Sequence, residues 1–97
     1  MGTDLVYVVG GVHFHIPGRL LYVHRTLLGA QVQALELTNM LRDYVDLPPH
    51  TEESTWEDAV EEARVKRAAD MGYPNVEDLN GSEDDGWVEI FDTQLLT

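Results

Sequence analysis

Short apolar runs near the start of the chain have the composition and alternation that are typical of β-strands. Residues 5–9 and 12–16 are rich in β-branched and aromatic side chains, and Gly10-Gly11 between them suits the two-residue turn of a hairpin. Pro17-Gly18 predicts a second turn, and residues 20–24 then form a third strand. The first 25 residues are therefore predicted to form a β-hairpin or three-stranded meander.

A turn at Gly10-Gly11 determines which side chains share a face of the predicted sheet. The core face would collect Leu5, Tyr7, Val9, Val12, Phe14, Ile16, Leu21 and Val23. The other face would carry Val6, Val8, His13, His15, Leu20, Tyr22 and His24. Several of these residues are more apolar than exposure to solvent requires, so this second face is a candidate contact for another protein or for a second copy in a homodimer.

The hydrophobic period then becomes helical over residues 26–46, where Thr26 is a suitable N-cap and Pro48-Pro49 prevents continuation. The apolar residues of this long helix form two stripes, so we expect it to touch two surfaces. The stripes are Leu28, Val32 and Leu35 on one side, and Ala30, Ala34, Leu37, Leu41 and Tyr44 on the other. A second helix is predicted over residues 54–72, with a capping box formed by Ser54 and Glu57 and with Gly72 as its end.

Residues 73–86 form an acidic loop by composition, with a short helical turn from Asn75 to Leu79, and residues 87–92 form a final strand. Strands followed by helices and a last strand predict an α+β fold. The expected architecture is a single domain, residues 1–97, with a small antiparallel sheet made of the N-terminal hairpin or meander and the C-terminal strand. Both main helices would pack on one face of that sheet.

Charge divides the chain into two halves. Residues 1–42 have a formal charge of +1 and residues 43–97 a formal charge of −13, which gives the net charge of −12. A field of that strength attracts cationic partners and repels nucleic acid. The chain has no cysteine and therefore no disulfide, and it has no apolar run of membrane-spanning length, so a cytoplasmic protein without membrane contact is expected.

The acidic residues gather in the second helix and in the region after it. Helical spacing places Glu57 with Glu61, and Asp58 with Glu62, in two short rows. Complementarity to the helix dipole explains part of this pattern, since Arg64, Lys66 and Arg67 occupy the second half. It does not explain the acids between residues 77 and 92. The candidate partner-binding residues are Glu57, Asp58, Glu61, Glu62, Glu77, Asp78, Glu83, Asp84, Asp85 and Glu89.

Catalytic and metal-binding signatures are weak. No nucleotide-binding loop, nucleophile elbow or H-E-x-x-H motif is present, and the loop from Asn80 lacks the residue order of an EF-hand, so we expect no calcium site and no cofactor. His13, His15 and His24 share one face of the predicted meander, where they could converge on a metal ion. Nearby carboxylates to complete such a site are scarce, so an enzyme is not the leading hypothesis.

The leading hypothesis is a small acidic binding protein that inhibits or regulates a basic, nucleic-acid-handling target without binding nucleic acid itself. In composition alone the chain resembles phage-encoded DNA mimics, including anti-restriction and anti-CRISPR inhibitors, and immunity proteins that neutralise nuclease toxins. One alternative is a homo-oligomeric structural or assembly protein, such as a virion component. A second alternative is a small metal-dependent enzyme that uses His13, His15 and His24.

Overall fold

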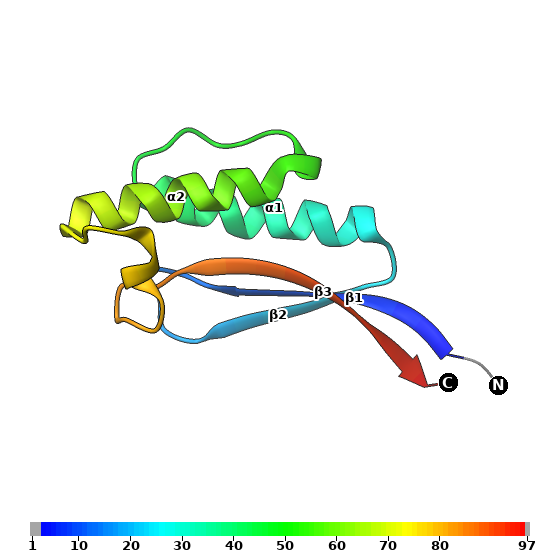
Figure 1. Ribbon diagram of the computed structural model, residues 1–97. Coiled ribbons are helices and arrows are strands. Elements are labelled where there is room, and N and C mark those ends of the chain that lie inside the picture. Colours follow the sequence, from blue (N-terminus) through cyan, green and yellow to red (C-terminus); the bar gives the residue numbers. More distant parts are fainter. Residues whose placement is uncertain (1–2, 97) are drawn as a thin grey trace.

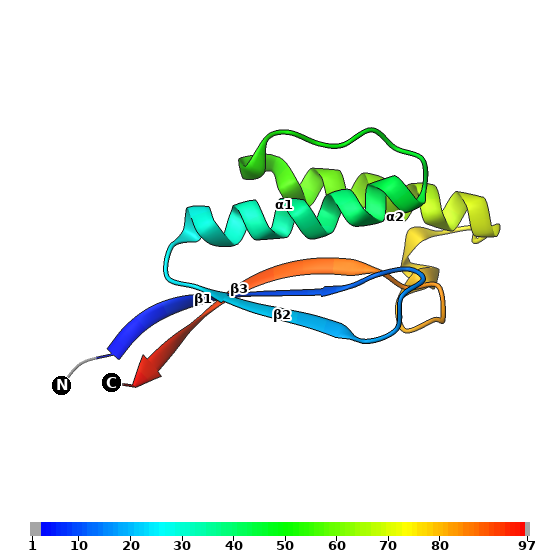
Figure 2. The same ribbon diagram turned by 180° about the vertical axis from the view of Figure 1, so that it is seen from behind.

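The computed structural model describes residues 3–96 and has two layers, a three-stranded sheet and a pair of helices that cover one of its faces (Figures 1 and 2). The strands are β1 (Thr3–Val12), β2 (Arg19–His24) and β3 (Trp87–Leu96), and they are antiparallel in the order β2-β1-β3. The helices are α1 (Leu27–Tyr44) and α2 (Trp56–Met71), accompanied by the short 3₁₀ helices η1 (Glu53–Thr55) and η2 (Val76–Leu79). The predicted α+β class is confirmed.

The predicted hairpin turn at Gly10-Gly11 is wrong, because both glycines lie inside β1. Gly10 is opposite Leu21 of β2 and Glu89 of β3, and the chain reverses only in the segment 13–18. Consequently the predicted second strand over residues 12–16 does not exist. Gly11 serves close packing against a helix instead: a Cβ atom there would lie 3.1 Å from Cδ1 of Leu37 on α1.

Moving the turn also exchanges the two faces for the predicted third strand, whereas Phe14 in the connecting segment is buried in the core as predicted. Leu21 and Val23, predicted to enter the core, share a face with Val8 and Gly10 on the side away from the helices, and both are exposed. Leu20, Tyr22 and His24 are on the helix side instead. That open face of the sheet carries Val6, Val8, Gly10 and Val12 of β1, Arg19, Leu21 and Val23 of β2, and Trp87, Glu89, Phe91 and Thr93 of β3.

The core lies between the sheet and the two helices. One predicted stripe of α1, which includes Ala30, Ala34, Leu37 and Leu41, is buried against Val9 and Val88, and Trp56, Val60 and Ala63 of α2 complete the cluster. The alanines allow the helix to approach the strands closely. In the other stripe Leu35 packs against the core, while Leu28 and Val32 are exposed. The second surface expected for α1 is thus only partly covered.

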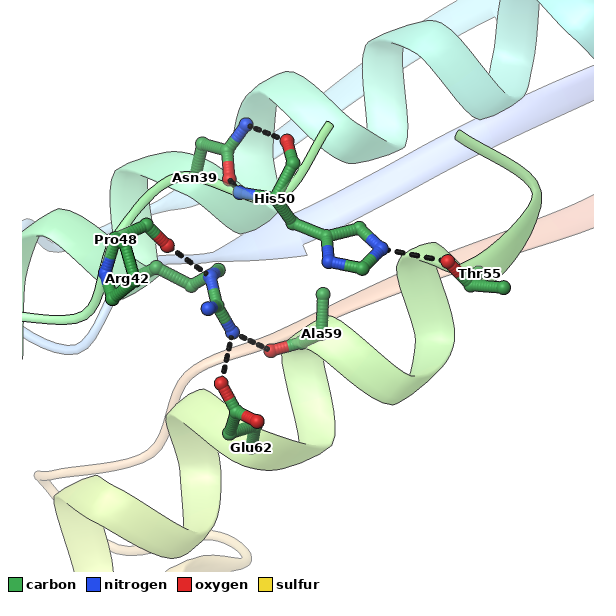
Figure 3. Close-up of polar contacts among 7 residues, drawn as sticks. All are labelled: Asn39, Arg42, Pro48, His50, Thr55, Ala59 and Glu62. Atoms are coloured by element: carbon green, nitrogen blue, oxygen red, sulfur yellow. Dashed lines mark hydrogen bonds and ion pairs between the residues drawn. The ribbon is translucent and has the colours of Figure 1, made fainter. Parts of the chain in front are cut away.

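Both helices run in the same direction, so the connection between them returns along their length (Figures 1 and 2). Side chains of α1 hold this connection in place (Figure 3). The amide of Asn39 exchanges two hydrogen bonds with the backbone of His50, at 3.0 and 2.8 Å. Buried Arg42 donates to the carbonyl oxygens of Pro48 at 2.8 Å and Ala59 at 3.1 Å. A guanidinium with five N–H donors can satisfy this many acceptors at once.

Two of the three caps predicted for the main helices are confirmed, and Asn75 caps η2 as predicted. Oγ1 of Thr26 accepts from the amide of Gly29 at 3.0 Å, and Gly72 ends α2 with a left-handed φ of 80° while Tyr73 N–H bonds to Ala68 O at 2.9 Å. The capping box at Ser54 is wrong. Ser54 lies within η1, one residue too early to cap α2, and its hydroxyl donates to Oε1 of Glu52 at 3.1 Å.

The strands β1 and β3 continue beyond the end of β2 as a two-stranded ribbon that projects from under the helices (Figure 1). The fold is accordingly elongated, with extents of 53 × 27 × 20 Å. Because β1 supplies the partner for ten residues of β3, this last strand is longer than the predicted segment 87–92.

Candidate functional site

Acidic side chains occupy the outer surface at the beginning of α2. Glu57, Asp58 and Glu61 are exposed, and within the described part of the chain no hydrogen bond or ion pair engages their carboxylates. Two of them, Glu57 and Glu61, stand one above the other along the helix, as the spacing predicted. This part of the surface therefore presents carboxylates that form no ion pair with any described residue.

A groove of about 470 Å³ runs beside this row, between α2, η2 and the beginning of β3. Its apolar lining comes from Trp56, Val60, Val76, Trp87 and Val88, and its acidic lining from Glu57, Glu61 and Glu77. Arg64 also borders the groove, but its guanidinium pairs with Asp85. A second groove of about 430 Å³ shares Trp56, Glu57 and Val88 with the first and continues toward Leu27 and Ile90. The structure thus brings Glu57, Glu61 and Glu77 of the predicted set together around one depression with an apolar floor. We call these residues the acidic groove.

Glu62 is the exception among the acids at the beginning of α2. Its Oε1 accepts from Nη1 of Arg42 at 2.8 Å (Figure 3). The side chain of Arg42 is only 6% exposed, whereas that of Glu62 is 61% exposed. Glu62 is therefore largely exposed to solvent, and it compensates the charge of Arg42, which holds the connection between the helices.

Asp84 and Asp85 are not free surface charges. Asp85 pairs with Arg64 at 2.7 Å and Asp84 pairs with Arg67 at 2.9 Å, and the aspartate side chains are only 16% and 21% exposed. Arg64 also donates to Oδ1 of Asn80 and to the carbonyl oxygen of Gly86. The hydroxyl of Tyr73 donates to Asp84 at 3.0 Å. These contacts fasten the loop to the last turns of α2, which gives both aspartates an internal structural role.

An aromatic cluster that the sequence analysis missed surrounds Arg67. The guanidinium carbon of Arg67 lies 5.3 Å from the ring centre of Tyr44 and 5.6 Å from that of Phe14. His15 stacks on Tyr44 with ring centres 5.4 Å apart. Phe14 was assigned to a strand, and that assignment alone does not bring its ring to α2. The cluster closes the end of the molecule at which the segment 13–18 meets the loop 80–86.

The remaining predicted residues are distributed over several surfaces. Glu77 belongs to the acidic groove, and Asp78 on the same short helix accepts from the amide of Asn75 at 3.2 Å. Glu83 is exposed in the loop. Glu89 lies on the open face of the sheet and pairs with Arg19 at 2.8 Å. The predicted set is therefore not one continuous site.

The three histidines of the metal hypothesis do not converge. His13 and His15 follow the end of β1, while His24 is paired with Tyr7 near the opposite end of β2. Nε2 of His13 lies 3.3 Å from Met40 O, and its Nδ1 accepts from the amide of His15 at 3.1 Å, so both ring nitrogens have partners in the protein. Among the residues that the structure describes, no group of three or more possible ligands is arranged to hold a metal ion.

Comparisons of the chain with protein-family models, with curated proteins and with solved structures found no match. Within residues 3–96, no helix combines the length and the apolar character needed to cross a bilayer.

Proposed function

We propose that this protein binds a basic partner through the acidic groove and the neighbouring acids of α2, and that it thereby inhibits or regulates a nucleic-acid-handling target. The observation that carries the proposal is the groove itself: Glu57, Glu61 and Glu77 surround an apolar floor, and no cation in the described part of the chain pairs with them. Carboxylates left without partners at a concave surface favour a cationic ligand.

Internal ion pairs determine which acids contribute most to the electrostatic field of the molecule. Asp84, Asp85 and Glu62 are each compensated by an arginine, whereas Glu57, Asp58 and Glu61 are not. The net charge of −12 steers a basic protein toward the molecule, and the uncompensated part of α2 determines where that protein docks. Asp84 and Asp85, which are also among the predicted partner-binding residues, hold the loop that lies at one end of the groove.

The lining of the groove fits arginine or lysine side chains better than a simple cation. Trp56, Val60 and Val88 offer apolar surface to the methylene groups of such side chains, while the carboxylates at the rim accept from the charged head groups. Nucleic-acid-binding proteins present arginine and lysine side chains in rows that normally meet phosphates. A row of carboxylates can occupy the same groups and exclude the nucleic acid by competition.

Affinity capture from host extract tests the proposal, with elution by a salt gradient and with a matched pair of triple variants. One variant combines Glu57→Gln, Glu61→Gln and Glu77→Gln. The other combines Glu36→Gln, Asp43→Asn and Asp46→Asn, which neutralises three exposed acids outside the groove. We expect basic proteins to be retained by the unmodified chain and by the control, to be released by salt, and to be lost by the groove variant.

Two results would contradict the proposal. Equal loss of binding in both triple variants would mean that net charge alone attracts the partner, and retention that does not respond to salt would exclude an electrostatic contact. Addition of duplex DNA or RNA supplies the test of the target class. A nucleic-acid-handling partner should release this protein when its own ligand is added, whereas any other basic partner should not.

A self-assembling structural protein is the second candidate function, and one observation favours it. The open face of the sheet exposes Leu21, Val23 and Phe91, which together form apolar surface without a partner inside the molecule. If assembly were the function, the molecular mass in solution should rise with concentration in the absence of any other protein. Sedimentation of the purified chain measures this directly.

A further inference from the structure

The edge strand β2 has an unusual surface. Leu20, Leu21, Tyr22 and Val23 follow one another without a polar residue, and all are exposed, by 40, 57, 37 and 65%. Successive residues of a strand point to opposite faces, so apolar surface lies on both sides of this edge. Packing of another protein on the open face would cover Leu21 and Val23, but it would leave Leu20 and Tyr22 in water.

We propose that β2 is the pairing edge of a symmetric homodimer, in which the β2 strands of two copies join antiparallel into one six-stranded sheet. An edge strand has backbone N–H and C=O groups without strand partners, and proteins that stay monomeric protect such edges with lysine, proline or bulges. Between Leu20 and Val23 the strand has none of these. Pairing at this edge provides neighbours for all four apolar side chains.

Charge identifies a second copy as the occupant. A molecule of net charge −12 repels its own kind everywhere except where its acids are distant, and β2 is the strand farthest from β3 in the sheet. After pairing, the two β3 strands would be separated by five intervals of about 4.8 Å, or about 24 Å in all. That distance exceeds the Debye length of about 8 Å at physiological ionic strength. A basic partner, in contrast, would be drawn to the acids at the opposite side.

The geometry of an antiparallel pair permits only certain registers. With a two-fold axis perpendicular to the sheet, residues that face one another must lie on the same side of it, so Leu21 would be opposite its own copy or opposite Val23. Both registers join apolar side chains. Because α1 packs against all three strands, its axis lies near the central one, and two such helices would be about 14 Å apart, beyond the 8–10 Å at which helices collide.

Sedimentation equilibrium over a range of protein and salt concentrations tests this proposal. We expect a monomer–dimer equilibrium that becomes tighter as salt screens the repulsion between the copies, the opposite of the salt effect expected for a basic partner. Tyr22→Lys and Val23→Lys, on the two sides of the edge, should each raise the dimer Kd about tenfold or more. Leu28→Lys, an equally charged change at an exposed position of α1, should leave it unchanged.

Competing arrangements give different results. A monomer at every concentration, or a dimer that Val8→Lys in the middle of the open face dissociates and Tyr22→Lys does not, would overturn edge pairing. Hydrogen exchange provides an independent measurement, since amides at alternate positions of β2 should become protected as the concentration rises. Failure of this prediction would not affect the function proposed for the acidic groove, because binding of a basic partner can be detected whether the protein is a monomer or a dimer.

Discussion

Asp84 and Asp85 in the loop before β3 and Glu57 and Glu61 at the beginning of α2 are similar groups in different surroundings. The loop aspartates are largely buried and face arginines whose side chains are only 14% and 11% exposed. The helix glutamates are exposed and have no cationic partner in the described part of the chain. A high local density of acids therefore includes two kinds of carboxylate in this protein: those that hold the fold together through ion pairs, and those that remain exposed.

The difference divides α2 into two functional halves. Its second half contributes Arg64 and Arg67, which fasten the loop, and Lys66, which pairs with Asp70 at 2.7 Å. Its first half contributes carboxylates that, apart from Glu62, form no ion pair with any of residues 3–96. The excess negative charge of the helix is thus displaced toward its N-terminus, beside the groove, and that is the surface we assign to a partner.

The largest effect expected from this comparison is that of Arg64→Met. This change leaves Asp85 partly buried without its cation and removes donors from Asn80 and Gly86, so we expect the free energy of unfolding to fall by about 3 kcal/mol. Urea denaturation measures the loss. Arg64→Lys keeps the positive charge but loses the planar guanidinium with its several donors. Its free energy of unfolding should therefore lie between that of the unmodified protein and that of Arg64→Met. A loss below about 1 kcal/mol, typical of an exposed ion pair, would contradict the structural role of the loop aspartates.

A second test concerns the steric packing of the loop rather than its charge. A methyl group at Gly86 would overlap the ring of Phe14, which is itself buried under Arg67. We expect Gly86→Ala to destabilise the fold by about 2 kcal/mol, as overpacking of a filled site usually does. Combining Gly86→Ala with Phe14→Leu should cost less than the sum of the two single changes. Strict additivity in thermal or urea unfolding would show that the two positions are not in contact.

How much of this structure the sequence could predict depends on the range of each interaction. Thr26 and Gly72 act on neighbours within their own helix, so both ends were predicted correctly. Gly10-Gly11 suits a turn, and Gly11 equally suits close contact with a helix. Only the position of Leu37, which lies far along the chain, decides between them. A local pattern could not contain that information.

The candidate site follows the same rule. The row of Glu57 and Glu61 arises from helical spacing and was predicted, whereas the groove beneath it requires β3 and η2 to come together. The pairs Arg64–Asp85 and Arg67–Asp84 also join distant segments. A usable signal existed, since two arginines on one side of a helix match two adjacent aspartates. The signal was missed because the arginines and the aspartates lie some twenty residues apart in the sequence.

Glu62→Gln tests the intermediate case, an acid with a buried partner and an exposed carboxylate. Arg42 would keep its hydrogen bonds to Pro48 and Ala59, and the amide of the new glutamine can still accept from it. We therefore expect a loss of stability below about 1 kcal/mol, clearly smaller than that of Arg64→Met. Urea denaturation of both variants under the same conditions gives the ratio. Equal losses would mean that exposure does not separate structural from free carboxylates in this molecule.

The smallest effect on stability is expected for Glu61→Gln. No partner in the described residues loses a contact, and Glu61 lies beyond the first turn of α2, where the helix dipole acts most strongly, so stability should change by no more than about 0.5 kcal/mol. Its effect on the retention of a basic partner should nevertheless exceed that of Glu36→Gln. A carboxylate whose removal weakens the partner and spares the fold is one that the fold does not require. If Glu61→Gln destabilised the protein as much as Glu62→Gln, the division between the two kinds of acid would be wrong at its most exposed position.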